Sequence, residues 1–117
     1  MKQLKSYKNT IDVYERFHLR DIVNYNGQSY YISTCETYDR GLETMVFEIM
    51  KPYEDFHELG AVEGNKDFPL KDEDVDWSGI YVRLHLSKGQ ARRVHIQVVN
   101  AIKKYGDPRK SLFKNKI

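Results

Sequence analysis

The feature that most constrains this chain is the dipeptide Asn26-Gly27, which stands between two runs of β-branched and aromatic residues. A two-residue hairpin turn needs positive φ at both central positions, and Asn-Gly tolerates this conformation well. A second turn, at residues 38–41, ends in Gly41, which can adopt the left-handed conformation that closes a longer loop. Residues 21–50 are therefore predicted to form a meander of three antiparallel strands.

Alternating side chains extend this prediction to a fourth strand. In the third strand of the meander, apolar residues at 45, 47 and 49 alternate with a mixed set at 44, 46 and 48. Residues 79–86 alternate as cleanly, which predicts a strand with its apolar side turned inward. The apolar side of that strand holds Ile80, Val82, Leu84 and Leu86, and its outer side is expected to hold Tyr81, Arg83 and His85.

A helix is predicted over residues 88–105. Ser87 is a favourable N-cap, and Gln90 stands three positions later, as in a capping box. Lys103 and Lys104 complement the helix dipole in the last turn, and Gly106 can form the C-cap. At 100° per residue, one stripe gathers the side chains that should pack on the sheet. These are Ala91, Val94, His95, Val98, Ala101, Ile102 and Tyr105.

Together these patterns predict a single α+β domain over residues 1–117, with a three- or four-stranded antiparallel sheet and one C-terminal amphipathic helix packed on one face. The remaining segments are an N-terminal helix or strand at 1–20, an acidic loop at 51–75 with a short helical turn at 53–59, and a basic tail at 107–117. A chain of this length should hold one core. Its expected centre is Met45, Phe47, Ile49, Ile80, Val82, Leu84, Val94, Val98 and Ile102.

The sequence also indicates where the protein resides. Cys35 is the single cysteine, so no intramolecular disulfide can form and a reducing compartment fits best. The first ten residues lack the apolar core of a signal peptide, and no apolar run approaches the roughly 18 residues that a membrane span needs. We therefore expect a soluble cytoplasmic protein that does not associate with membranes.

Charge is segregated along the chain although the net charge is only +2. Residues 1–50 carry six basic and seven acidic residues, residues 51–76 carry three and nine, and residues 77–117 carry ten and one. The acidic middle and the basic C-terminal third can neutralise each other within the fold. Alternatively, the basic part can form a face for nucleic acid or for an acidic partner.

Three motifs resemble a group of small uncharacterised phage and prophage proteins. They are the strand pair ISTCETYDRGLETMVFEI, the turn at Asp76-Trp77, and a helix with the pattern A-x-x-x-H-x-x-V-V from Ala91 to Val99. The chain departs from that group in its acidic insert, and the helix has Lys88, Arg92 and Arg93 where the group has an acidic run. The resemblance implies a phage or mobile-element origin and carries over no activity.

Most catalytic and metal-binding patterns are missing from the sequence. The run of aspartates at 72, 74 and 76 starts like a calcium loop, but Trp77 and Arg83 occupy the positions of the required glycine and glutamate. None of the four histidines has metal-ligand spacing, and His95 lies on the apolar helix stripe, where a core histidine hydrogen-bonded to a backbone carbonyl or a tyrosine is expected. Cys35 stands inside a strand, which predicts a small packing residue. We therefore expect a protein without enzymatic activity, metal or cofactor.

The basic and aromatic residues of the C-terminal third form the candidate interaction surface. We expect a small protein-binding module, in a specific form an inhibitor of a host nucleic-acid-handling or defence protein. The alternative is a nucleic-acid-binding domain, because exposed aromatics beside basic residues can stack on bases and contact phosphates. A homodimer is a further alternative. The surface residues are Tyr81, Arg83, His85, Lys88, Arg92, Arg93, Ile96, Lys103 and Lys104.

Overall fold

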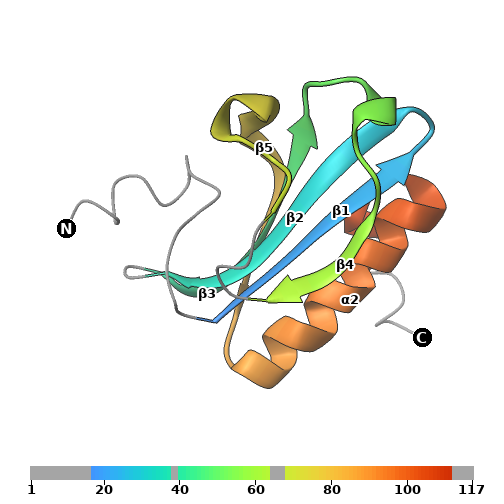
Figure 1. The fold of residues 1–117 in the computed structure, drawn as a ribbon. Coiled ribbons are helices and arrows are strands. Elements are labelled where there is room, and N and C mark those ends of the chain that lie inside the picture. The colour runs from blue at the N-terminus through green and yellow to red at the C-terminus, as the bar shows by residue number, and fades with distance from the viewer. Residues whose placement is uncertain (1–16, 38–39, 64–67, 112–117) are drawn as a thin grey trace.

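The computed structural model describes residues 17–37, 40–63 and 68–111. It is an α+β fold in which five antiparallel strands form one sheet and the helix α2 lies along one face (Figure 1). The strand order is β4-β1-β2-β3-β5, which places β4 and β5 at the two edges. The elements are β1 (His18–Tyr25), β2 (Gln28–Thr37), β3 (Gly41–Ile49), the 3-10 turn η2 (Tyr53–Asp55), β4 (Leu59–Glu63), the 3-10 turn η3 (Asp72–Asp74), β5 (Val75–His85) and α2 (Lys88–Tyr105).

The predicted meander is confirmed. Asn26 and Gly27 have φ of 49° and 81°, and the turn that they make pairs Tyr25 with Gln28. At the second turn Gly41 has φ of 75° and pairs with Thr37. The chemistry of the turn residues thus fixes the register of both hairpins.

The bounds of the predicted helix are also confirmed. The Ser87 hydroxyl accepts a hydrogen bond from the Gln90 backbone N–H at 3.1 Å, and the Gln90 side chain accepts one from the Leu86 N–H at 2.7 Å. The reciprocal half of the capping box is therefore displaced by one residue. Gly106 caps the other end with φ of 69°, and its N–H donates to the Ile102 carbonyl at 2.8 Å.

The sheet has two cores, and the prediction of a single core was wrong. Between α2 and the sheet lie the buried side chains of Val23, Tyr30, Ile32, Val46, Val94, Val98, Val99 and Ile102. On the opposite face lie Ile22, Tyr31, Phe47, Ile49, Phe56, Leu70 and Val75. Because side chains alternate along a strand, the neighbours Val46 and Phe47 belong to different cores. The segment that follows β3 covers the second face with Phe56 and Leu70.

The orientation predicted for β5 was reversed. The register pairs Tyr81 with Val46, whose side chain faces α2, so Tyr81, Arg83 and His85 lie on the helix side. The apolar residues Ile80, Val82 and Leu84 lie on the other side and are 43%, 53% and 57% exposed. The second core ends near Val75 and Trp77, so it does not reach them. A register shift beside Gly79, whose φ is 75°, changes the alternation along β5.

The acidic loop predicted at 51–75 contains a strand. The prediction of three or four strands missed β4, which pairs antiparallel with β1. β4 is five residues long, it includes Gly60, and Ala61 has φ of 39°, so it shows little alternation in sequence. Of the helical turn predicted at 53–59, residues 53–55 form η2, whereas Phe56 is extended and Leu59 begins β4. β1 begins at His18, inside the predicted N-terminal segment; the prediction for residues 1–16 and that for the tail beyond 111 lie outside the described residues.

Candidate functional site

The nine residues of the predicted interaction surface do not share one surface. Lys88, Arg92, Arg93, Ile96, Lys103 and Lys104 are exposed on α2 or at its start. The three residues from β5 instead point towards α2: His85 is buried, and Tyr81 and Arg83 are half-buried. The sequence predicted the alternation along β5 correctly. It predicted that the apolar face is buried and that the face with Tyr81, Arg83 and His85 is exposed, and the structure shows the reverse.

Two of the predicted basic residues are paired with acids of the 51–76 segment. The Arg92 guanidinium lies 3.5 Å from the Glu63 carboxylate, and the Lys103 ammonium lies 3.7 Å from Glu58. These pairs join α2 to the β4 side of the molecule. They support the interpretation that the acidic segment 51–76 and the basic segment 77–117 neutralise each other on that side of the helix. All four side chains are exposed, so each pair contributes at most about 1 kcal/mol to stability.

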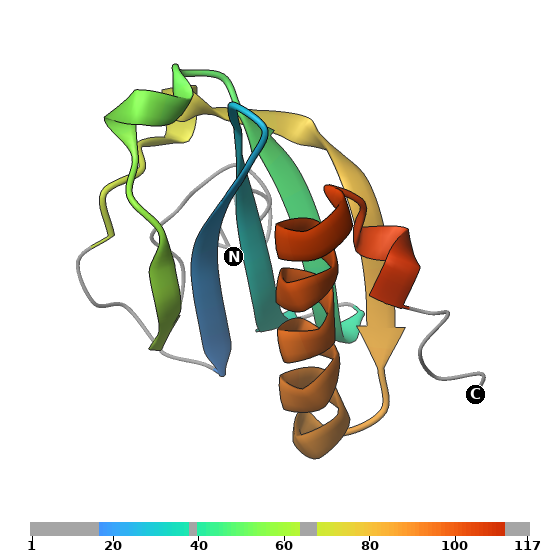
Figure 2. The ribbon, with the colours of Figure 1, turned by 90° about the vertical axis from the view of Figure 1, so that its right-hand side faces the viewer.

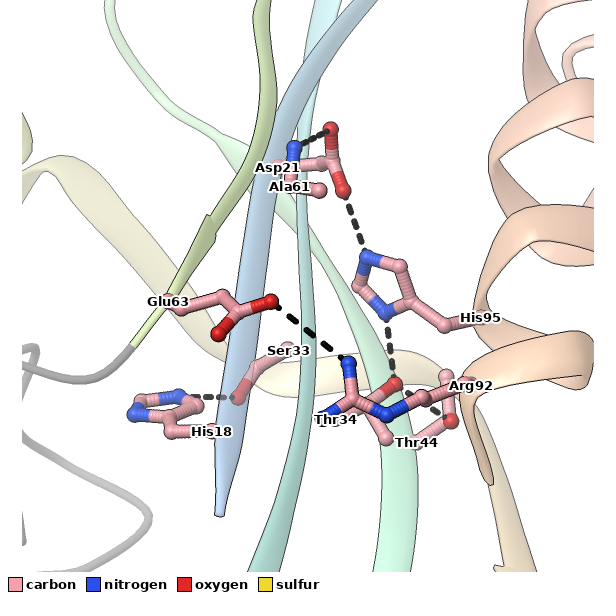
Figure 3. A network of polar contacts seen from close by, with 9 residues as sticks. All are labelled: His18, Asp21, Ser33, Thr34, Thr44, Ala61, Glu63, Arg92 and His95. Atoms are coloured by element: carbon pink, nitrogen blue, oxygen red, sulfur yellow. Dashed lines mark hydrogen bonds and ion pairs between the residues drawn. The ribbon is translucent and has the colours of Figure 1, made fainter. Parts of the chain in front are cut away.

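A chain of buried hydrogen bonds, here called the polar network, links Asp21, His95, Thr34, Thr44 and His85 (Figure 3 shows the first four). The four contacts along it measure 2.5, 2.6, 2.6 and 2.7 Å. The second oxygen of Asp21 accepts from the Ala61 N–H at 2.8 Å. The network therefore ties α2 to four strands of the sheet, and it connects β1 to β4.

One continuous direction satisfies these hydrogen bonds. The Asp21 carboxylate accepts from His95 Nε2, and in a neutral His95 imidazole Nδ1 then accepts from the Thr34 hydroxyl. Thr34 then accepts from Thr44, and Thr44 accepts from His85 Nε2. Burial, with Arg83 nearby, lowers the pKa of His85 to about 4, which keeps that ring neutral near pH 7. Every donor in the chain thus has an acceptor.

Although the polar network connects an aspartate, a histidine and a hydroxyl one after another, its role is structural. The side chains of Thr34 and Thr44 are fully buried, and His95 is 1% exposed, so the hydroxyls do not meet a molecule outside the protein. The prediction of a hydrogen-bonded core histidine at position 95 is confirmed. Its partners are the Asp21 carboxylate and the Thr34 hydroxyl, and the predicted partner, a backbone carbonyl or a tyrosine, was wrong.

A second polar group lies on the sheet face opposite α2. His18 Nε2 is 3.0 Å from the Ser33 hydroxyl, and burial, with Arg20 nearby, lowers the pKa of His18 to about 3. Cys35 lies beside Ser33 and is 2% exposed, and burial raises the pKa of its thiol well above its usual value. A thiol in this state is a poor nucleophile. The prediction that Cys35 is a small packing residue is confirmed.

The aspartates that resemble the start of a calcium loop are directed to other partners. Asp74 accepts from the Lys71 N–H at 2.9 Å and lies 3.2 Å from the Lys51 ammonium. Asp76 accepts from both the N–H and the hydroxyl of Ser78. Over residues 17–37, 40–63 and 68–111, no three His, Cys, Asp or Glu side chains gather as a metal site. In the same ranges, no helix is long and apolar enough to cross a membrane.

The most unusual surface feature is the edge formed by β5. Ile80, Val82 and Leu84 form an exposed apolar row along it, and Leu86, directly after the strand, is 95% exposed. Beside this row, Met45 and residues 78–82 line a shallow groove of about 310 Å³. Figure 2 shows β5 at the edge of the sheet, and no other described strand pairs with its outer side. The alternation in the sequence predicts this row but places it in the core.

The functional interpretation of this protein rests on its geometry. No protein-family model, curated protein or solved structure matches this chain. The resemblance to phage and prophage proteins therefore stays a prediction.

Proposed function

We propose that this protein is a non-enzymatic protein-binding module that binds its partner along the outer edge of β5. The observation that carries the proposal is the row of Ile80, Val82 and Leu84 on an edge strand, each more than two-fifths exposed. An edge strand offers unpaired backbone N–H and C=O groups, and a partner strand can add to them while its side chains cover the apolar row.

The two edges of the sheet differ in a way that supports this assignment. β4 has five residues, with an irregular register against β1 and a positive φ at Ala61, so it is a poor template for another strand. β5 has eleven residues and contains no proline, and its one charged residue beyond Gly79 is Arg83. Proteins usually shorten, charge or cover such an edge, and β5 shows little of this protection among the described residues.

The specific form of the proposal is an inhibitor from a phage or mobile element that acts on a host nucleic-acid-handling or defence protein. Nucleic-acid binding remains the alternative, carried by the exposed basic residues of α2. Two of these, Arg92 and Lys103, are already paired with acids. A gel shift that weakens steeply with salt would favour nucleic acid over protein as the ligand.

The test compares two substitutions of the same chemical kind. Val82→Lys places a charge in the middle of the β5 row, and Ile96→Lys places one on the exposed face of α2. The two original side chains are similarly exposed, at 53% and 58%, so both variants should fold like the wild type. Each protein is tagged and used to capture partners from a bacterial lysate.

A protein retained by the wild type and by Ile96→Lys, but lost with Val82→Lys, would support the proposal. Equal retention by all three proteins would place the binding surface elsewhere and refute it. Capture of nothing by the wild type would count against a protein-binding role. Circular dichroism spectra of the variants establish that a loss of binding does not arise from unfolding.

A further inference from the structure

We infer that the partner presents an extended segment in which apolar residues alternate with aspartate or glutamate. This inference rests on the proposed function, because it names the chemistry of what binds the β5 edge. It follows from the different character of the two faces of β5: one is an apolar row, and the other borders on unpaired positive charge.

The geometry of strand addition determines which side chains meet. Residues opposite each other on neighbouring antiparallel strands point to the same face of the sheet. Partner residues opposite Val82 and Leu84 therefore lie on the open face, where they continue the apolar row. Those opposite Tyr81 and Arg83 lie on the face that α2 covers. The added strand must thus be apolar on one side, and its other side must suit the helix-side border of β5.

That border is basic. Within β5, Arg83 Nη1 and Tyr81 Oη are both buried and make no hydrogen bond among the described residues. The sequence has no aspartate or glutamate from residue 77 to residue 106, so neither the rest of β5 beyond Asp76 nor α2 supplies Arg83 with a carboxylate. A carboxylate opposite Arg83 would accept from the guanidinium, and it would relieve a buried donor that lacks an acceptor.

The open face of the edge has room for a larger apolar side chain. The groove of about 310 Å³ is lined by Met45 and by residues 78–82, so it adjoins the apolar row near Ile80. A second copy of this chain suits the edge less well. It would bring the same basic border and a second Arg83 to the interface, where like charges repel.

The experiment measures the anisotropy of fluorescent octapeptides titrated with the purified full chain. The first probe alternates valine and glutamate, the second has lysine in place of glutamate, and the third has serine in place of valine. We expect the valine–glutamate peptide to bind at least about tenfold more tightly than either comparator, because the charge-assisted hydrogen bond to Arg83 and the row of apolar contacts each strengthen binding. Its affinity should fall as salt is raised.

Two variants assign the peptide to the edge. Val82→Lys should weaken binding of the valine–glutamate peptide by about tenfold or more, because it interrupts the apolar row. Ile96→Lys should leave the affinity within about twofold, since it lies on another face of the molecule. Sedimentation velocity on the wild type and Val82→Lys shows whether the chain associates with itself through the same edge.

Equal binding of the lysine and glutamate peptides, no binding of either, or binding that Val82→Lys leaves unchanged would overturn the inference. A wild-type dimer that Val82→Lys converts to a monomer would also overturn it, because the occupant would then be a second copy. If the peptides fail while capture from a lysate still depends on Val82, the peptide chemistry alone is wrong. If Val82→Lys also leaves the capture of partners from a lysate unchanged, the proposed function is refuted together with the inference.

Discussion

Replacing Thr34 with valine should reveal how much the polar network contributes to stability. Valine has nearly the same shape as threonine, so the change removes the hydroxyl without opening a cavity. In the wild type that hydroxyl forms hydrogen bonds with His95 Nδ1 and with the Thr44 hydroxyl, each at 2.6 Å. Without it the imidazole nitrogen and the Thr44 hydroxyl each lose a hydrogen-bond partner in the buried interior.

The expected cost follows from those two orphaned groups. A buried polar group left without its hydrogen-bond partner costs about 1–3 kcal/mol, so the two together should cost the variant about 2–6 kcal/mol of the free energy of unfolding. A domain of this size has a total stability of about 5–15 kcal/mol, so a wild type in the middle of this range leaves the variant folded. With m of about 2 kcal/mol/M in urea, the unfolding midpoint should fall by about 1–3 M while m stays the same.

The assay is urea unfolding followed by circular dichroism at pH 7, with Thr44→Val and the double variant measured beside Thr34→Val. The Thr34–Thr44 hydrogen bond is lost in both single variants, so the double variant should cost less than their sum by about 0.5–3 kcal/mol. A cost for Thr34→Val below about 0.5 kcal/mol, or simple additivity in the cycle, would refute the argument that these hydroxyls form one continuous network.

Lowering the pH from 7 to 5 should destabilise the protein by up to about 2 kcal/mol for each of His18 and His85. In the folded protein the pKa values of these two histidines are about 3 and about 4, below the ordinary value of 6.5. The unfolded chain therefore binds the protons over this pH range and the folded protein does not. This stability is present above pH 6.5 and is lost as the pH falls towards the folded values. Urea midpoints between pH 7 and pH 5 check the slope, and a flat profile would show that these rings are not held neutral. Separately, Gly106→Ala should cost about 2–4 kcal/mol, since its φ is 69° and a Cβ there would stand 2.4 Å from the Tyr25 ring. Gly27→Ala is its control, with φ of 81° and open space around it, and thermal melts should show a smaller loss of about 1–2 kcal/mol; equal losses would mean that the ring contact does not matter.

The local elements of this fold could be predicted because local chemistry specifies them. Asn26-Gly27 has the φ values that its hairpin needs, and Ser87 and Gly106 bound the helix as their capping preferences indicate. β4 could not be predicted in the same way. Its five residues show little alternation, and they become a strand because β1 offers a free edge to pair with.

The candidate site shows the same division. The alternation of apolar and polar residues along β5 was visible in the sequence, and so was the excess of positive charge after residue 76. A period of two says that a strand has two different faces, but it does not say which face the rest of the molecule covers. That choice was made by the pairing of Tyr81 with Val46, which turned Arg83 towards the helix and left Val82 in solvent.

By itself, then, the sequence determined where the hairpins turn, where the helix begins and ends, and which residues alternate, because these depend on backbone preferences within a few residues. The tertiary structure decided the rest. It paired β4 with β1, divided the apolar residues between two cores, and joined Asp21 to His95 across 74 positions of the chain. It also left the apolar row of β5 exposed, because covering a face depends on which distant segments pack against it, and no local pattern records that.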